Sequence, residues 1–142
     1  MNGSPAFSAY AIASTVVALH LILLAFWTGA VRGRVNTYVA AEDAKAFKGE
    51  KAGTEHPDVI RAQRAHINAL ESAVPFFVVG LLYAMTGATA TGAAAYYYTF
   101  VGARVLHSIF YLRGMQPWRT IAFAVGVLAI VGMAVHVLRV SI

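Results

Sequence analysis

Four long, mostly apolar segments constrain the fold of this chain more than any other feature. The first, residues 8–31, contains no Asp, Glu, Lys or Arg, and the others cover about residues 58–85, 93–112 and 118–140. About 20 predominantly apolar residues are enough for a helix to cross a bilayer. The pattern therefore predicts an all-α integral membrane protein, a four-transmembrane-helix bundle that forms a single membrane domain over residues 1–142.

The composition excludes several classes of function. Charged residues make up 12% of the chain, against about a quarter in an average soluble domain. The chain has no cysteine and therefore no disulfide framework, no thiolate zinc site and no cysteine nucleophile, and we expect no metal site. No basic face of a soluble fold is evident, so nucleic acid is not an expected partner. A cleaved signal peptide is disfavoured for the first segment, because residues 1–8 lack Lys and Arg.

The distribution of basic residues predicts the orientation in the membrane. Residues 33–57 form the one long polar connection, in which residues 40–47 are expected to form a short helical turn. Lys and Arg gather in and around the first and third loops, at Arg32, Arg34, Lys45, Lys48, Lys51, Arg113 and Arg119. Because cytoplasmic loops are enriched in Lys and Arg, the first loop should be cytoplasmic and both termini outside, in an inner, plasma or endoplasmic reticulum membrane.

Polar side chains within two of the spans are expected to face one another. Those of the second span fall within an arc of about 80° on a helix, and they are Arg61, Arg64, Asn68 and Glu71. On the third span, Arg104, His107 and Tyr111 lie at i, i+3 and i+7, again on one face. Glu71 and Arg104 should both lie about 14–15 Å below the cytoplasmic surface, so we expect them to form an ion pair. Whether that pair serves only the stability of the bundle is left open by the sequence.

The excess of arginines over acids at this depth indicates an anionic ligand. Guanidinium groups bind carboxylates through paired hydrogen bonds. Arg119 and Thr120 open the fourth helix, whose N-terminus carries a partial positive charge. A ligand thiol there would have its thiolate form favoured by the helix dipole, by Arg119 and by the Thr120 hydroxyl. The alternative for Arg119 is an ordinary basic anchor at the membrane surface.

Two spaced motifs resemble those of a known family. Residues 61–71, Arg-Ala-Gln-Arg-Ala-His-Ile-Asn-Ala-Leu-Glu, resemble the R-x-x-R-x-H-x-N-x-x-E signature of the MAPEG family, the membrane-associated proteins in eicosanoid and glutathione metabolism. Residues 104–111 and 117–119 resemble the R-x-x-H-x-x-x-Y and P-x-R segments of its microsomal prostaglandin E synthase branch. The likeness covers nearly the whole chain from Arg32 onward.

The resemblance implies a homotrimer with glutathione sites between neighbouring subunits, open to the cytoplasm. It implies a glutathione-dependent transferase, peroxidase or isomerase that acts on lipophilic electrophiles arriving from the membrane lipid. By position, the residues implied to bind glutathione or support its pocket are Arg32 (from the adjacent subunit), Arg64, Asn68, Glu71, Arg104, His107, Tyr111 and Arg119. The catalytic residues that it implies are Arg119 and Thr120 at the sulfur and Asp43 as a loop acid.

Departures from the branch pattern leave the substrate open. Ile67 stands where the branch has an arginine and Phe123 where it has a tyrosine, whereas Thr120 replaces a serine and keeps the hydroxyl. A non-catalytic, lipid-binding scaffold of the same fold is the main alternative, and the presence of Arg119 argues against it. A small multidrug exporter is a further alternative, but it would need a membrane-embedded acid in the first span, and residues 8–31 contain none.

Overall fold

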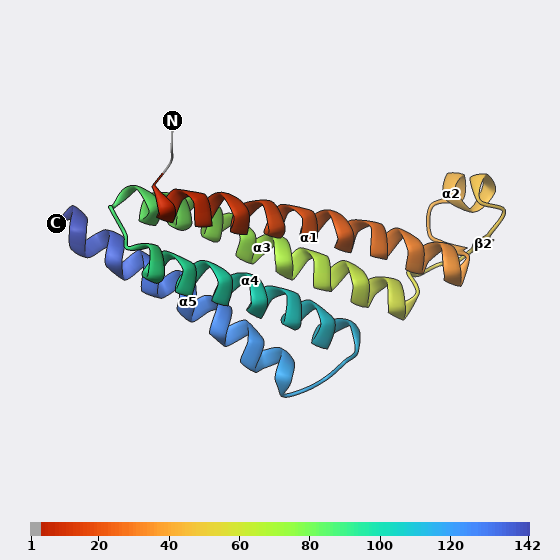
Figure 1. Cartoon of the computed structure of the whole chain (residues 1–142). Helices are drawn as coiled ribbons and strands as arrows, with labels where there is room; N and C mark the ends of the chain where they lie inside the picture. The colour runs from red at the N-terminus through yellow and green to blue at the C-terminus, as the bar shows by residue number, and fades with distance from the viewer. Residues whose placement is uncertain (1–3) are drawn as a thin grey trace.

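The computed structural model describes residues 4–142, which form four long helices, one short helix and two very short strands (Figure 1). The elements are α1 (Pro5–Val35), β1 (Thr37–Tyr38), α2 (Ala41–Ala46), β2 (Glu50–Lys51), α3 (Pro57–Met85), α4 (Ala90–Leu112) and α5 (Trp118–Ser141). The long helices lie side by side along one common direction (Figure 1). A helix is present at each of the four predicted segments, with bounds that differ by up to four residues, and α2 falls where the short helical turn was predicted. That all four helices cross a membrane stays a prediction.

Local capping explains where the helices begin and end. Ser4 caps α1, since its Oγ accepts a hydrogen bond from the Phe7 N–H at 3.2 Å, and Thr89 caps α4 through the Gly92 N–H at 3.1 Å. Such side-chain oxygens satisfy backbone donors that the first turn leaves free. At the other end of α1, Asn36 takes a left-handed conformation with φ of 52° and stops the helix.

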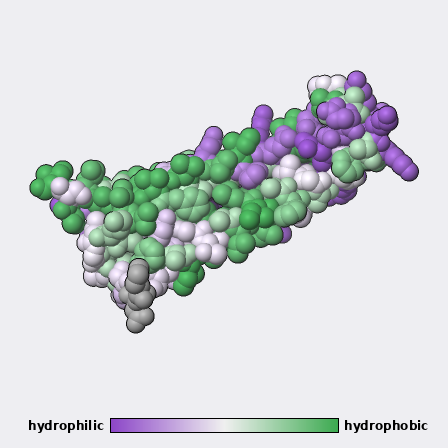
Figure 2. All heavy atoms as spheres, turned by 90° about the horizontal axis from the view of Figure 1, so that it is seen from above, coloured by the Kyte–Doolittle hydropathy of each residue, from purple (hydrophilic) through white to green (hydrophobic). Residues whose placement is uncertain are grey.

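Three of the helices between residues 4 and 142 are long and apolar enough to cross a membrane: α1, α3 and α5. The fourth, α4, has 23 residues and is not among them; it contains Arg104, His107 and several tyrosines. The outer surface of the bundle is rich in exposed apolar side chains; Phe26 is 74% exposed and Leu128 66%. Figure 2 shows this apolar surface along the body of the molecule and a hydrophilic cap at the end that carries α2. This is the surface of a membrane protein.

The interior is packed by small residues and by one aromatic cluster. The buried residues of the first half of α1 include Ala6, Ala9 and Ala13, which allow the neighbouring helices to approach closely there. Phe76 and Phe100 are fully buried and stack with their ring centroids 4.1 Å apart. The core also includes Ala129 and Met133 of α5 and therefore holds all four long helices together.

The connections lie at two opposite ends of the bundle. α1 begins and α5 ends at one end, whereas the polar 36–56 connection and the α4–α5 turn lie toward the other (Figure 1). The polar connection is folded, because β1 and β2 pair in parallel, Thr37 with Glu50 and Tyr38 with Lys51. The two basic loops therefore lie toward the same end of the bundle, as predicted, whereas the membrane topology and the compartment that they face stay predictions.

Candidate functional site

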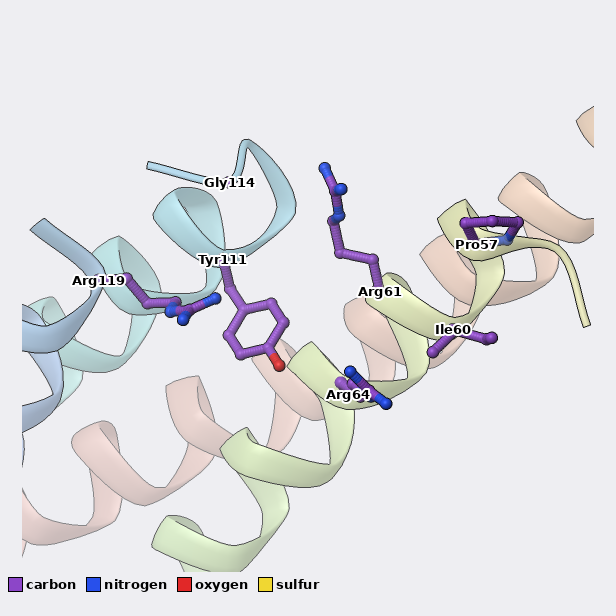
Figure 3. Close-up of a pocket in the computed structure, with 7 residues that line it drawn as sticks. All are labelled: Pro57, Ile60, Arg61, Arg64, Tyr111, Gly114 and Arg119. Carbon is purple, nitrogen blue, oxygen red and sulfur yellow. The ribbon is translucent and has the colours of Figure 1, made fainter. Parts of the chain in front are cut away.

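A cavity of about 370 Å³ opens between α3, the end of α4 and the start of α5 (Figure 3). Its wall is formed by Pro57, Ile60, Arg61, Arg64, Tyr111, Gly114 and Arg119. We call it the arginine cavity. Three guanidinium groups share it, and the lining residues that the structure describes include no carboxylate. Positive charges that share a cavity repel one another, and an anion between them relieves that repulsion. The arrangement fits a ligand with more than one negative charge.

Tyr111 and His107 position Arg119 at one end of the arginine cavity. The central guanidinium carbon of Arg119 lies 4.6 Å from the centroid of the Tyr111 ring. Figure 3 shows the two side chains next to each other. His107 Nδ1 lies 2.9 Å from the Arg119 carbonyl oxygen. Because a carbonyl oxygen only accepts, Nδ1 carries the proton and donates it to this bond. In the neutral ring Nε2 is then an acceptor, and this buried atom has no hydrogen-bond partner within residues 4–142.

A second cavity, of about 300 Å³, continues the first along the groove between α3 and α5. It begins at Asn68 on α3 and Phe123 on α5, about one helical turn beyond Arg64 and Arg119. Its other lining residues are Glu71, Ser72, Pro75, Val127, Ile130 and Val131. Asn68 Oδ1 is buried and has no partner in the described part of the chain. The groove thus changes from guanidinium groups, through an amide and a carboxylate, to an apolar wall.

Glu71 and Arg104 form no ion pair within residues 4–142, so that prediction is wrong. The two side chains have different neighbours. Arg104 is 3% exposed, and its Nη2 donates to the carbonyl oxygen of Phe123 at 3.0 Å. Gly126 leaves room for this contact, since a Cβ there would lie 2.8 Å from Arg104 Nε. Glu71 is exposed in the groove between α3 and α5. Periodicity indicated that both residues face other helices, but it does not say which helix each one meets.

Five predicted site residues line neither cavity of the single subunit: Arg104 and His107, described above, and Arg32, Asp43 and Thr120. Arg32, at the end of α1, forms an ion pair with Glu55, with Nη2 2.8 Å from Oε2. Asp43 lies on α2 in the polar connection. Thr120 is exposed at the start of α5, where its hydroxyl oxygen lies 3.0 Å from the Gln116 side chain. The roles assigned to these residues stay predictions.

Two residues outside the predicted set belong to the same site. Arg61 lines the arginine cavity, and Gln116 contacts both Arg119 and Thr120. Arg61 could have been selected from the sequence, because it is spaced i, i+3 from Arg64 and residues so spaced are neighbours on a helix. Gln116 precedes the first residue of α5, so helical periodicity gave no reason to select it.

Comparison with known proteins identifies relatives along almost the full length of the chain. The family model described as the MAPEG family matches residues 10–139. Microsomal glutathione S-transferase 1 of Homo sapiens is 36% identical over 138 residues, which cover 94% of this chain and 89% of that protein. The Rattus norvegicus protein of the same name is 37% identical over 139 residues, covering 94% and 88%. Prostaglandin E synthase of Homo sapiens is 32% identical over 136 residues, covering 95% and 90%.

Proposed function

Because the chain belongs to the MAPEG family, as its two motifs predicted, we propose that it is a glutathione-dependent membrane enzyme that acts on lipophilic electrophiles. Its relatives are named as glutathione S-transferases and prostaglandin E synthases. The observation that carries the proposal is the arginine cavity, where Arg61, Arg64 and Arg119 meet without a lining carboxylate. The cavity adjoins an apolar groove, so an anionic cofactor and a lipophilic substrate would meet there.

The side chains along the groove fit the charges of glutathione, which has two carboxylates, one ammonium group and a thiol. Arg61 and Arg64 supply guanidinium groups for carboxylates. Glu71 supplies a carboxylate for the ammonium group, and Asn68 Oδ1 is a buried acceptor without a partner in the described chain. Each charged group of the ligand therefore has a complementary side chain on α3.

Glutathione supplies a thiol whose thiolate form is the nucleophile or reductant in each of the three reaction types considered. Arg119, at the start of α5, provides a positive charge for that sulfur. Thr120 provides a hydroxyl donor, and Tyr111 holds the Arg119 guanidinium in place. The apolar wall beyond Phe123, which includes Val127 and Val131, is suited to a substrate that enters from lipid. Conjugation, peroxide reduction and isomerisation would share this sulfur chemistry.

Glutathione added to the purified protein should produce the ultraviolet difference absorbance of a thiolate at neutral pH. Free glutathione is mostly protonated there, because an unperturbed thiol has a pKa of about 8.5. An S-methyl analogue, which cannot ionise, is the matched control and should bind without that absorbance. Binding of glutathione with no thiolate absorbance would favour the scaffold over the enzyme, and no binding of either compound would contradict the proposed function.

We further propose that the functional unit is a homotrimer with the site completed by a neighbouring subunit. Arg32 and Asp43 lie outside the groove in one subunit, and a neighbour's copies could reach it. Glu71, Arg61 and Arg64 are exposed in the single subunit, as expected of groups that a second subunit covers. The detergent-corrected mass should be three times that of one chain. A monomeric mass with glutathione binding intact would contradict the shared site.

We propose that α4 is the fourth span and that residues 1–142 form a single membrane domain. At 1.5 Å per residue its 23 residues reach about 34 Å, enough to cross the hydrocarbon core. Its polar residues Arg104 and His107 are buried and would be kept away from lipid. Basic loops should then face the cytoplasm and both termini the outside. A reporter fused after Ile142 that is active only in the cytoplasm would contradict this orientation.

A further inference from the structure

The Gln116 side chain lies between the two side chains proposed to act on the sulfur. With its amide oxygen toward Arg119, that oxygen accepts hydrogen bonds from Nη2 at 2.6 Å and from Nε at 3.1 Å. The amide nitrogen then donates to Thr120 Oγ1 at 3.0 Å. The opposite orientation would set the NH₂ group against the guanidinium donors, where no hydrogen bond can form. The surroundings therefore select the orientation in which the amide oxygen faces Arg119.

This orientation determines where the Thr120 proton goes. A hydroxyl has one proton to donate and two lone pairs that accept. Because Thr120 Oγ1 accepts from the Gln116 amide nitrogen, its own proton is not used in that bond and can be donated to another acceptor. With the amide reversed, the hydroxyl would donate to Gln116 Oε1 instead. The amide thus leaves the Thr120 proton available to a sulfur anion.

The same amide also restricts the guanidinium of Arg119. Gln116 accepts from one edge of the group, through Nε and Nη2, while the central guanidinium carbon lies over the Tyr111 ring, 4.6 Å from its centroid. The remaining Nη1 donors are left for a ligand. A carboxylate in this place would cancel the charge of the guanidinium. An amide oxygen is neutral, so it orients the guanidinium and leaves its charge in place. The net positive charge stays available at the start of α5.

We propose that Gln116 is a positioning residue that orients Arg119 and releases the Thr120 proton toward the sulfur of bound glutathione. The role rests on the proposed function. It assigns part of the thiol activation to the turn before α5, through one side chain that contacts both sulfur-facing groups. Gln116 itself need not touch the ligand.

The test compares Gln116→Ala, Gln116→Glu and the matched control Gln63→Ala by titrating the thiolate absorbance of bound glutathione. Gln116→Ala should lower kcat and the thiolate fraction at neutral pH about threefold to tenfold, less than Arg119→Ala, because Gln116 acts on the sulfur only through Arg119 and Thr120. The KM for glutathione should change less than twofold. Gln116→Glu should lose more, because the carboxylate neutralises Arg119 and cannot donate to Thr120. Gln63 lies on α3 and lines neither cavity, so its replacement should change nothing.

A double-mutant cycle with Thr120→Ala separates positioning from a merely structural role. If Gln116 acts partly through the hydroxyl, Gln116→Ala should have a smaller effect once Thr120 is alanine. An unchanged thiol pKa in Gln116→Ala, beside a normal wild-type thiolate absorbance, would overturn this inference alone. Absence of that absorbance in the wild type would overturn the proposed function and this role with it.

Discussion

Replacing Arg119 by alanine should remove most of the catalytic rate while leaving most of the affinity for glutathione. Arg119 lies at the start of α5 over the Tyr111 ring, where its charge would favour the thiolate. The carboxylates and the ammonium group would still be held by Arg61, Arg64 and Glu71. A positioned charge of this kind is commonly worth about 10²–10³ in rate, by analogy with single oxyanion donors. The pKa of the bound thiol should rise in parallel.

The measurement is a titration of the bound thiolate beside turnover of a generic aromatic electrophile. Arg119→Lys should recover little, because a point charge does not reproduce the planar guanidinium fork. Thr120→Ala should have a smaller effect than Arg119→Ala, and Thr120→Ser should be nearly silent because it keeps the hydroxyl. The control is Arg139→Ala, which removes an exposed arginine at the last turn of the same helix. A wild-type rate and an unshifted thiol pKa in Arg119→Ala would contradict the catalytic role and indicate that Arg119 is only a basic anchor at the membrane surface.

Replacing Arg64 by alanine should have the opposite kinetic signature, a large loss of affinity with little change in kcat. Arg64 lines the arginine cavity about one turn from Asn68, at the end away from the apolar wall. It is proposed to bind a carboxylate that does not change charge during the reaction, so its contact is equal in the ground state and the transition state. A hydrogen bond to a charged group is worth about 1.5–3 kcal/mol, which corresponds to about a 10- to 150-fold rise in Kd.

Equilibrium binding of glutathione, measured beside kcat, tests this assignment. Arg113→Ala is the matched control, since Arg113 is exposed at the end of α4 and lines neither cavity. Arg64→Lys should keep part of the affinity through its charge. If Arg64→Ala bound glutathione as tightly as the wild type, the arginine cavity would not be where the carboxylates lie.

Much of the fold could be predicted from the sequence because membrane helices are specified locally. A segment such as residues 8–31 has no charged side chain to place in lipid, and a helix satisfies its own backbone hydrogen bonds. Capping residues such as Ser4 and Thr89 mark the boundaries within a few positions. The pairing of β1 with β2 was not predicted, because two-residue strands leave no periodicity to recognise.

The candidate site was predicted in part, since a helical face groups residues of one helix but does not assign the partner helix. Arg64 and Tyr111 were placed on faces that meet, and both line the arginine cavity. Arg104 was expected to meet Glu71, yet it extends across Gly126 to the carbonyl oxygen of Phe123 on α5. The absence of a side chain at residue 126 decided that contact, and its consequence is visible only once α4 and α5 are packed.

Sequence alone was sufficient for the membrane class, the approximate positions of the helices and the family motifs, because each depends on residues close together in the chain. The tertiary structure was needed to identify which guanidinium groups share one cavity and which already form an ion pair, as Arg32 does with Glu55. It was also needed to place Gln116 against Arg119 and Thr120. These contacts depend on how helices cross and how a turn folds back, and such geometry is set by packing over the whole bundle.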